Sequence, residues 1–351
     1  MRVKNLTDIP DGFTGDTVPT SLCVGFRYIG NHHYEEIDGL RAEALYHAII
    51  SCIFWGIEMK IVFRRFDDSC YDKVCDFLIE LSKYDRNHIN WNWARWEWMF
   101  FHPEFNRDLM DKIGLWYCND ELVGMTTYDH YFGEAFFATK QGFRELEKDI
   151  LNYATDTFSN ENGLGIAVND KDTHTLDLLS SKKFLENDLT ENILELTLKN
   201  VSLDYITPEG IIIKNIDINN DLYKLHHLLW KAFDNEGPVP VDEATMSKQR
   251  VMLSAPHLNS WIHIVAENEN GEYVAYCGIW YSQKTDYVYV EPVCTIPEYR
   301  QKGLGKAVVL EALKRGCSLG AEKAYVISDS SFYKSLGFQQ HSHYTFYWHN
   351  A

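Results

Sequence analysis

The sequence predicts a two-domain protein of the α/β class, of the α+β type, and three observations lead to that prediction. The length of 351 residues exceeds what one ordinary core needs and fits two domains. Asn270-Gly271, between two apolar segments, is a strong hairpin signal and predicts paired antiparallel strands. One order of strands and helices is predicted twice along the chain, which indicates an internal duplication at the scale of a domain.

The C-terminal copy is assigned to residues 204–351. Leucines at helical spacing predict a helix at 221–233. Asp242 can cap a second helix, and Gly320 ends a later one. The expected order is strand 211–213, helix 221–233, helix 242–253, strands 261–267, 272–281 and 287–295, helix 304–319, strand 323–327, short helix 330–335 and strand 343–348.

The N-terminal copy, residues 59–203, repeats this order. Its expected elements are strand 61–66, helix 71–84, helix fragment 96–101, strands 114–118, 122–128 and 135–139, helix 143–157, strand 165–168, short helix 175–181 and a closing strand 193–198. Residues 1–58 fit neither copy and are treated as an appendage of unknown role.

Composition and charge narrow the function. The apolar fraction of 45% and the charged fraction of 24% are those of a globular protein. The formal charge is −18, from 51 acidic and 33 basic residues, and such a field repels nucleic acid and anionic membranes. It either serves solubility alone or attracts a cationic substrate to an acidic cleft. No apolar run approaches the ~20 residues that span a bilayer, and no signal peptide is evident, so we expect a cytoplasmic protein.

The cysteines and histidines show no spacing typical of metal or redox sites. No two of the eight cysteines form a C-x-x-C pair, which argues against zinc ribbons and thioredoxin chemistry. His32-His33 and His226-His227 are adjacent pairs, and no H-E-x-x-H occurs. Several cysteines lie in apolar runs, where a thiol behaves as a small hydrophobe. We therefore expect no metal.

A glycine-containing turn stands between the strand at 287–295 and the helix at 304–319. It reads Arg300-Gln301-Lys302-Gly303-Leu304-Gly305 and is followed by Lys306. Glycine allows a conformation and a close approach that a Cβ would obstruct, and N–H groups at a helix N-terminus converge on an anion. Arg300, Lys302 and Lys306 make this turn locally positive in a chain that is acidic as a whole. We predict that it binds phosphate groups, with a generic tight turn as the alternative.

Two flanking features accompany the turn. Pro292, in the strand before it, cannot donate to a sheet ladder and belongs where pairing is broken or at an edge. A strand splayed from its neighbour there would leave backbone groups free for a ligand. After the next strand comes Phe332-Tyr333-Lys334-Ser335-Leu336-Gly337-Phe338. Together with the P-x-Y-R-x-K-G-x-G segment at the turn, and in this order of elements, the region from about 211 to 348 resembles the GNAT superfamily of N-acetyltransferases.

The resemblance implies that each domain is a mixed, mostly antiparallel sheet flanked by helices, and that acetyl-CoA is the acyl donor. It implies that Tyr333 protonates the departing CoA thiolate. It also implies main-chain contacts to the thioester and pantetheine arm from Val293, Cys294 and Thr295. The pyrophosphate would be held by the turn, that is by Arg300, Gln301, Lys302, Gly303, Leu304, Gly305 and Lys306.

Glu291 is the candidate general base. An amine attacks only when neutral, and a carboxylate with a raised pKa suits the removal of its proton, directly or through water. Glu291 shares strand parity with Val293 and Thr295, so the three side chains are expected to face the same way, although a bulge at Pro292 would upset that parity. The alternatives are a structural carboxylate at Glu291, a packing role for Tyr333, and a nucleophilic Cys294, for which no His or Asp relay is evident.

The corresponding positions of the N-terminal copy differ. Leu179 stands in the place of Tyr333, and the turn at 140–143 contains Gly142 alone. We predict that residues 59–203 form a degenerate GNAT-like domain without the anion site, which shapes the acceptor site or the interface between the halves. One chain is then expected to bind one acyl-CoA.

Four tryptophans crowd one short stretch of the N-terminal copy: Trp91, Trp93, Trp96 and Trp98. A helix would bring Trp91 and Trp98 near one face. Core packing is the expected role, and an aromatic wall for the acceptor is the alternative.

We interpret the chain as a tandem acyl-CoA-dependent N-acyltransferase, which transfers acetyl from acetyl-CoA to a primary amine of a small acceptor. The acidic charge favours a cationic acceptor such as an aminoglycoside, a polyamine or an amino-acid derivative. The rival is a CoA-binding module without turnover. We expect no nucleic-acid or membrane partner, and the oligomeric state stays open.

Overall fold

The structure is a computed structural model that describes residues 4–5, 25–30, 33–37, 60–84 and 88–350. The chain divides into two compact units, residues 1–62 with 117–121 and residues 63–116 with 122–351. Nearly all of both copies lies in the second unit. Within the described part of the first unit, a small sheet has the order β1–β3–β2, formed by β1 (Lys4–Asn5), β2 (Gly25–Gly30) and β3 (His33–Ile37). The rest of the predicted appendage lies outside the described residues.

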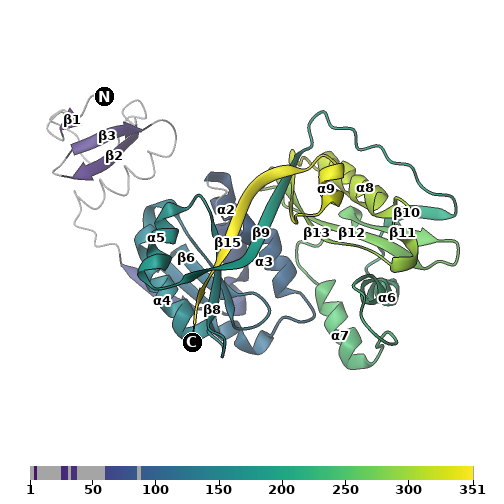
Figure 1. Ribbon diagram of the computed structural model, residues 1–351, viewed down its shortest axis with the longest axis horizontal. Coiled ribbons are helices and arrows are strands. Elements are labelled where there is room, and N and C mark those ends of the chain that lie inside the picture. Colours follow the sequence, from purple (N-terminus) through teal and green to yellow (C-terminus); the bar gives the residue numbers. More distant parts are fainter. Residues whose placement is uncertain (1–3, 6–24, 31–32, 38–59, 85–87, 351) are drawn as a thin grey trace. The chain divides into compact units, whose positions relative to one another are not determined.

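The N-terminal copy has the predicted order of elements (Figure 1). Asn92 caps α3 by accepting hydrogen bonds from the N–H groups of Ala94 and Arg95 at 2.9 and 3.2 Å, so this helix begins earlier than expected. The segment 141–146 is a 3₁₀ helix that precedes α4. The elements are β4 (Ile61–Arg65), α2 (Tyr71–Tyr84), α3 (Trp93–Phe100), β5 (Gly114–Cys118), β6 (Glu121–Tyr128), β7 (Glu134–Thr139), α4 (Glu147–Phe158), β8 (Leu164–Asn169), α5 (Thr173–Ser181) and β9 (Leu185–Thr197).

The C-terminal copy also confirms the predicted order. Asp242 caps α7, and its carboxylate accepts a hydrogen bond from the N–H of Thr245 at 3.0 Å. Asn270-Gly271 joins β11 to β12, which pair as an antiparallel hairpin. The elements are β10 (Ile211–Asn215), α6 (Leu222–Ala232), α7 (Glu243–Met252), β11 (His263–Asn268), β12 (Tyr273–Tyr281), β13 (Tyr287–Thr295), α8 (Leu304–Ser318), β14 (Lys323–Ile327), α9 (Ser331–Ser335) and β15 (Gln339–His349).

The two copies exchange their last strands. The described strands β4 to β15 form one 12-stranded sheet in the order β10-β11-β12-β13-β14-β9-β15-β8-β7-β6-β5-β4. β9 pairs with β14 of the other copy from Ile193 to Thr197, and β15 pairs with β8 from Tyr344 to His349. The two exchanged strands also pair with each other and lie side by side in Figure 1. The expectation that the strand at 193–198 closes its own copy is therefore wrong, because pairing between distant strands leaves no local signal.

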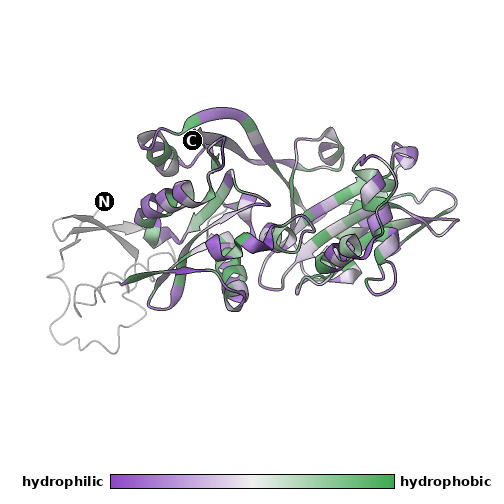
Figure 2. Cartoon of the chain, turned by 90° about the horizontal axis from the view of Figure 1, so that it is seen from below, coloured by the Kyte–Doolittle hydropathy of each residue, from purple (hydrophilic) through white to green (hydrophobic). Residues whose placement is uncertain are grey.

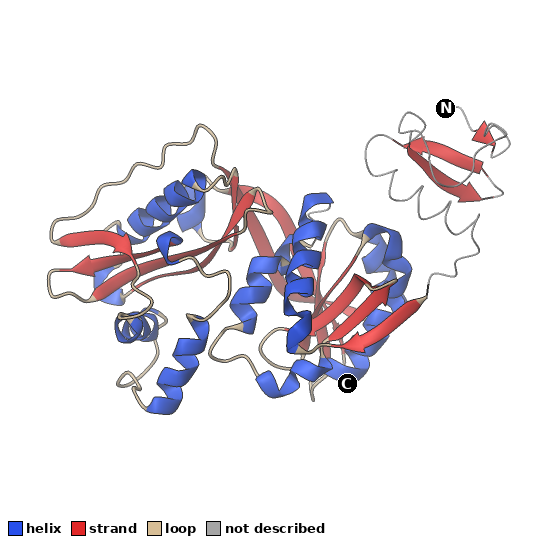
Figure 3. Ribbon diagram, turned by 180° about the vertical axis from the view of Figure 1, so that it is seen from behind, coloured by secondary structure: helices blue, strands red, loops and turns tan. Residues whose placement is uncertain are grey.

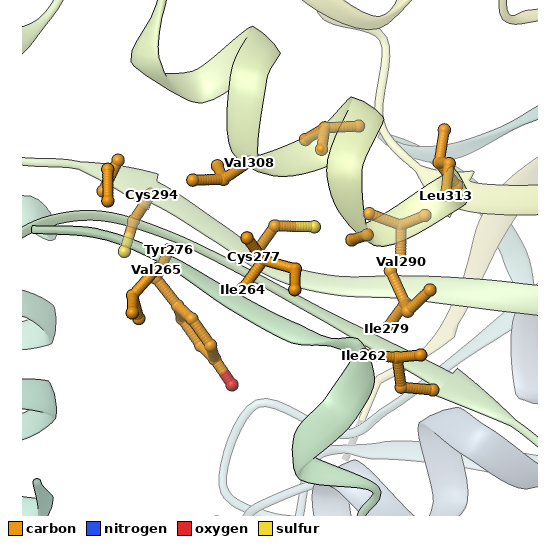
Figure 4. Close-up of a cluster of buried hydrophobic side chains, with 14 of the residues drawn as sticks. Ile262, Ile264, Val265, Tyr276, Cys277, Ile279, Val290, Cys294, Val308 and Leu313 are labelled. Atoms are coloured by element: carbon orange, nitrogen blue, oxygen red, sulfur yellow. The ribbon is translucent and has the colours of Figure 1, made fainter. Parts of the chain in front are cut away.

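Helices flank the sheet, as the sequence predicts (Figure 3). In the C-terminal copy the strands carry much of the hydrophobic colour in Figure 2, and α8 packs on one face of them. Figure 4 shows Val308 and Leu313 of α8 above β12 and β13. A Cβ at Gly316 would lie 3.0 Å from Val288, so a glycine lets the helix approach the strand closely. This packing fixes the beginning of α8 next to the end of β13.

The tryptophans of the N-terminal copy pack in its core. Trp91, Trp93 and Trp96 are 1%, 0% and 0% exposed, which confirms the core-packing role for these three. Trp98 is half-buried, and its ring lies 6.4 Å from the ring of Trp280 in β12. The fourth tryptophan therefore joins the two copies. No described helix is both long and apolar enough to cross a membrane.

We predict that a fragment of residues 204–351 does not fold into a stable domain, whereas a fragment of residues 184–351 is more stable. Both fragments lack β8, one neighbour of β15. The shorter fragment also lacks β9, which leaves the edge of β14 and both edges of β15 without partners, and unpaired edges promote aggregation. Urea unfolding of the two fragments, followed by circular dichroism, measures the difference. Equal, cooperative unfolding of both would contradict the role assigned to the exchanged strand.

Candidate active site

β13 and β14 diverge within the sheet. Their parallel ladder has three pairs, from Tyr287–Lys323 to Tyr289–Tyr325. Beyond Tyr289, β13 continues to Thr295 and pairs with β12 alone among the described strands. Beyond the bulge, Ile296 bonds to Val274 of β12, so main-chain groups of the alternate residues Val293 and Thr295 point to the edge of β13 that faces β14. This confirms the predicted splay, and the place where the two strands separate, beside Val293, Cys294 and Thr295, is called the opening below.

A bulge in β13 sets the directions of its side chains. Tyr289 lies opposite Trp280 and Val293 opposite Cys277, so the register shifts at Glu291 and Pro292. Directly opposed residues share a face, and Trp280 and Cys277 lie on different faces because they are three positions apart. Figure 4 shows Cys277 pointing towards α8 and Tyr276 pointing away from it.

Glu291 therefore does not face the same way as Val293 and Thr295. It shares a face with Tyr289, whose hydroxyl donates to its Oε2 at 2.6 Å. Thr295 faces α8, since its Oγ1 is 3.4 Å from the position of a Cβ on Gly305. The expectation of common parity is wrong, and the bulge is the reason. As a result the carboxylate lies on one side of β13 and the turn before α8 on the other.

The turn before α8 has the geometry of an anion cradle. Gly303 is the N-cap residue of the helix with φ of 83°, and Gln301 also has a positive φ of 61°. Ala307 donates to the carbonyl of Gly303 at 3.0 Å, so the N–H groups of Leu304, Gly305 and Lys306 precede the first intrahelical bond and have no acceptor within the helix. A Cβ on Gly303 would meet no atom within 4 Å. Glycine is needed there for its left-handed backbone, and the space beside it is open.

The cationic side chains of the turn have different surroundings. The guanidinium of Arg300 donates to the carbonyls of Thr295 and Ala232 at 3.0 and 2.8 Å and pairs with Asp234 at 3.1 Å. It therefore braces the turn against β13 and α6. Lys302 is exposed, with its Nζ 4.8 Å from the ring centroid of Tyr299, and Lys306 is exposed as well.

Tyr333 borders the same opening from α9, a short helix capped by Ser330. Burial, and then the neighbouring Cys277, Glu291 and Cys294, raise the pKa of Tyr333. Its hydroxyl therefore keeps its proton at neutral pH and can donate it. Burial also raises the pKa of Cys294 to about 12, so this residue is a thiol and not a thiolate nucleophile.

Glu291 has the surroundings of a general base. Burial raises its pKa, and the charges of Asp129 and Glu191 add to the increase. The Tyr289 hydroxyl and the charge of Arg95 act in the opposite direction but leave the pKa of Glu291 above its ordinary value. A carboxylate of this kind accepts a proton more readily than an exposed one.

Sequence reasoning missed the residues that surround Glu291. Arg95 Nη2 lies 2.9 Å from Glu191 and 3.5 Å from Asp129, and all three side chains are less than a quarter exposed. They come from α3, from β9 and from the end of β6, all in the N-terminal copy. Of the residues named here, Tyr289 alone could have been placed beside Glu291 from the sequence, because residues two positions apart on a strand share a face.

In the N-terminal copy the corresponding strands also diverge, and the turn before α4 is bonded to carboxylates of the same chain. β7 and β8 pair in parallel at Glu134–Gly165 and Ala135–Ile166 only. At the start of α4, Arg144 binds both oxygens of Asp172 at 2.6 and 2.7 Å and one oxygen of Glu147 at 2.9 Å. Asp172 is 7% exposed and Glu147 0%. Carboxylates of the chain itself thus neutralise the cation of this turn.

Two further contacts complete this internal site. The hydroxyl of Thr139, at the end of β7, donates to Glu147 at 2.9 Å. Burial alone would raise the pKa of Asp172, but the Arg144 guanidinium and the Thr175 hydroxyl outweigh it and lower that pKa. Leu179 of α5 is 0% exposed and packs in the core. Leu179 therefore supplies no hydroxyl at the position that corresponds to Tyr333.

Comparisons with known proteins agree with this geometry. Residues 222–338 match the model of the acetyltransferase (GNAT) family. A GCN5-related N-acetyltransferase from Sphaerobacter thermophilus has a similar structure, with a TM-score of 0.56 and 12% identity over 83% of this chain and 95% of that one. A tandem GNAT protein from the clavulanic acid biosynthesis pathway, solved without acetyl-CoA, has a TM-score of 0.58 and 12% identity over 83% and 98%. No relative was found among curated proteins.

The two structural similarities extend across both copies and show a common tandem fold. The family match falls on the copy that contains the diverging strands, the turn at Gly303 and Tyr333. Residues 222–338 are therefore similar to the acetyltransferase (GNAT) family, and they are set in a fold that resembles that of a tandem GNAT protein.

Proposed function

We propose that this protein transfers the acetyl group of acetyl-CoA to a primary amine of a small, cationic acceptor. The observation that carries the proposal is the divergence of β13 from β14, with the turn at Gly303 and Tyr333 on its border. It supplies unpaired main-chain groups, an anion cradle and a proton donor around one opening.

The donor is proposed to bind along β13. Main-chain groups of Val293 and the N–H of Thr295 point to the free edge and can bond the thioester and the amide groups of the pantetheine arm, whereas those of Cys294 point to β12. The free N–H groups at the start of α8 can bond the pyrophosphate, and Lys302 and Lys306 add positive charge in a chain of formal charge −18. Arg300 contributes by holding the turn in place.

The reaction needs three proton transfers, and Glu291 and Tyr333 are the groups that take part in them. Glu291 accepts the proton of the acceptor ammonium, directly or through water, and leaves a neutral amine. The amine nitrogen bonds to the thioester carbon, and the bond from carbon to sulfur breaks. Tyr333 then donates its proton to the thiolate, and the second proton lost by the nitrogen as it becomes an amide restores the tyrosine hydroxyl. N–H groups at the free edge of β13 stabilise the oxyanion that forms between these steps.

The acceptor is proposed to lie between the copies, on the side of β13 that carries Glu291. Asp129, Glu191 and Glu291 outnumber Arg95 there, so the local field favours a cation. This surplus supports an aminoglycoside, a polyamine or an amino-acid derivative over an anionic acceptor.

A CoA-binding module without turnover is the rival function. The release of free thiol from acetyl-CoA, measured with a panel of polyamines, aminoglycosides and amino-acid amides, separates the two. Amine-dependent release supports the transferase, whereas tight binding of CoA without release by any amine supports the rival.

We predict that Tyr333→Phe lowers kcat by at least about 10²-fold and leaves the affinity for acetyl-CoA nearly unchanged. The hydroxyl is needed only when charge develops on the departing sulfur. Steady-state kinetics and calorimetry measure the two quantities. Tyr281→Phe is the matched control, because its hydroxyl bonds to Leu319 at the far end of α8. An unchanged kcat for Tyr333→Phe, with chemistry rate-limiting, would return this tyrosine to a packing role.

We predict that Glu291→Gln removes the acidic limb of the kcat/KM profile and lowers the plateau by roughly 10²–10⁴-fold. The wild-type limb should lie above the ordinary range of a glutamate, since the pKa of Glu291 is raised. The base acts when deprotonated, so activity rises with pH through that pKa. Glu191→Gln should keep the limb and move it to lower pH, because it removes a charge that raises the pKa of Glu291. An unaltered profile in Glu291→Gln would place the base elsewhere.

We predict that one chain binds one acetyl-CoA and that Gly303→Val weakens this binding at least about tenfold. A left-handed backbone costs a residue with a Cβ roughly 1–2 kcal/mol, and the new side chain enters the open space beside the cradle. Calorimetric titration gives both stoichiometry and affinity. Gly271→Val is the control, because Gly271 has φ of 75° and equally open surroundings on a remote hairpin. A second site that survives Gly303→Val would contradict the inference that the N-terminal copy, in which Arg144 is bound by Asp172 and Glu147, does not bind acetyl-CoA.

A further inference from the structure

Three side chains with metal-binding groups lie together where the two copies meet. Cys75 comes from α2, Glu97 from α3, and His257 from the loop after α7. Their ligand atoms all lie within 4.8 Å of one another. Residues this far apart in the sequence meet only because the copies pack together. The cluster therefore belongs to the folded full chain.

Glu97 is the centre of the cluster, and its side chain is 0% exposed. Its Oε1 accepts a hydrogen bond from the N–H of His257 at 2.7 Å, and its Oε2 lies 2.5 Å from Nδ1 of the same residue. A carboxylate so deeply buried requires a cation or several donors beside it. Without a metal, a protonated His257 is that cation.

The hydroxyl of Tyr71 is an independent indication of a missing ligand. Tyr71 is 8% exposed, and its hydroxyl, which has Cys75 and Glu97 as neighbours, makes no well-aligned hydrogen bond to either. It lies one helical turn before Cys75 on the same face of α2. An unpaired buried hydroxyl costs about 1–3 kcal/mol. A water molecule on a metal ion among these residues would be its partner.

We propose that Cys75, Glu97 and His257 bind one zinc ion, with a water molecule as the fourth ligand. Thiolate, imidazole and carboxylate are the protein ligands that zinc uses, at about 2.3 Å for sulfur and 2.0–2.2 Å for nitrogen and oxygen. Three such ligands and one water complete a tetrahedron. The water lies within reach of the Tyr71 hydroxyl.

The charges of this site balance. A thiolate and a carboxylate neutralise Zn²⁺, so the buried cluster carries no net charge. The ion replaces two protons, one from the Cys75 thiol and one from the His257 imidazolium, and both protons pass to solvent. In the metal-free state the Glu97 carboxylate and the His257 imidazolium balance in the same way, so both states are compatible with burial.

The ligand atoms must adjust their separations to bind one ion, and the chain has room for this at His257. A nitrogen and an oxygen on one tetrahedral zinc are about 3.3 Å apart, given bonds near 2.0–2.1 Å, which is wider than the 2.5 Å between His257 and Glu97. The His257 side chain is 41% exposed and lies on a loop, so it can move outwards by this amount. The same exposure provides the path by which the ion enters.

The ion would fasten the copies together at a place remote from proton transfer. Two other contacts join the copies on the same side: Asp76 pairs with Lys284 at 2.5 Å, and the ring of Trp93 lies 5.7 Å from that of His257. Zinc at this point is therefore a structural link. The sequence shows no sign of it, because the ligands at positions 75, 97 and 257 form no spacing pattern, and the expectation of no metal rested on spacing alone.

The test measures zinc in the full chain, stripped with a chelator and then exposed to excess Zn²⁺ and desalted. Elemental analysis should find one zinc per chain in the wild type. Cys75→Ser and His257→Asn should each weaken binding by more than the roughly 10- to 100-fold that the loss of an outer-shell partner costs. Cobalt in place of zinc should give a thiolate charge-transfer band that disappears in Cys75→Ser.

Cys70→Ser is the matched control, because Cys70 is also buried and lies just before α2. It should keep the full zinc content and the cobalt band. Circular dichroism checks the fold of each variant, and His257→Asn changes an exposed loop where a folding failure is not expected.

A wild type that retains no zinc would overturn the proposal and leave Glu97 and His257 as an ion pair. Zinc content unchanged in both Cys75→Ser and His257→Asn would also overturn it. Both results are independent of acetyl transfer.

Discussion

The short parallel ladder between β13 and β14 is the constraint on which the site depends. It ends at Tyr289, after three pairs, and from there β14 is held along its other edge by β9 at five positions. The strand that keeps β14 in place thus belongs to the N-terminal copy. The opening in which donor chemistry is proposed is therefore a property of the joined sheet, to which the N-terminal copy contributes β9.

The N-terminal copy has diverging strands like those of the C-terminal copy but a different turn before its helix. Its strands β7 and β8 diverge as β13 and β14 do. The turns before α4 and α8 differ in where the negative charge beside them comes from. Arg144 is bound by Asp172 and Glu147 of its own chain, whereas the N–H groups before Ala307 are open to a ligand. Internal carboxylates fill the place of an external anion and at the same time stabilise the copy.

The sequence predicted elements well where the signal is local. The bounds of α2, β13 and β14 agree with prediction because apolar periodicity and turn residues mark them. The turn at Gly303 and the short helix with Tyr333 were found for the same reason. Their roles as cradle and acid stay proposals, because the structure contains no ligand.

What the sequence could not predict depends on contacts between distant residues. The exchange of β9 and β15 has no local signature, since either strand could close either copy. The direction of Glu291 follows from a bulge in β13, where one extra residue reverses the facing of all that follow. Arg95, Asp129 and Glu191 approach Glu291 only when the copies pack, and the meeting of Cys75, Glu97 and His257 has the same origin.

Amide hydrogen exchange in the presence and absence of acetyl-CoA tests the central claim most directly. If the donor lies along the free edge of β13 and in the cradle of α8, acetyl-CoA should slow exchange at residues 293–295 and 303–306. The corresponding segment of the N-terminal copy, residues 139–147, should exchange at the same rate with and without the ligand. Protection confined to that N-terminal segment, or none along β13 at saturating acetyl-CoA, would contradict the account.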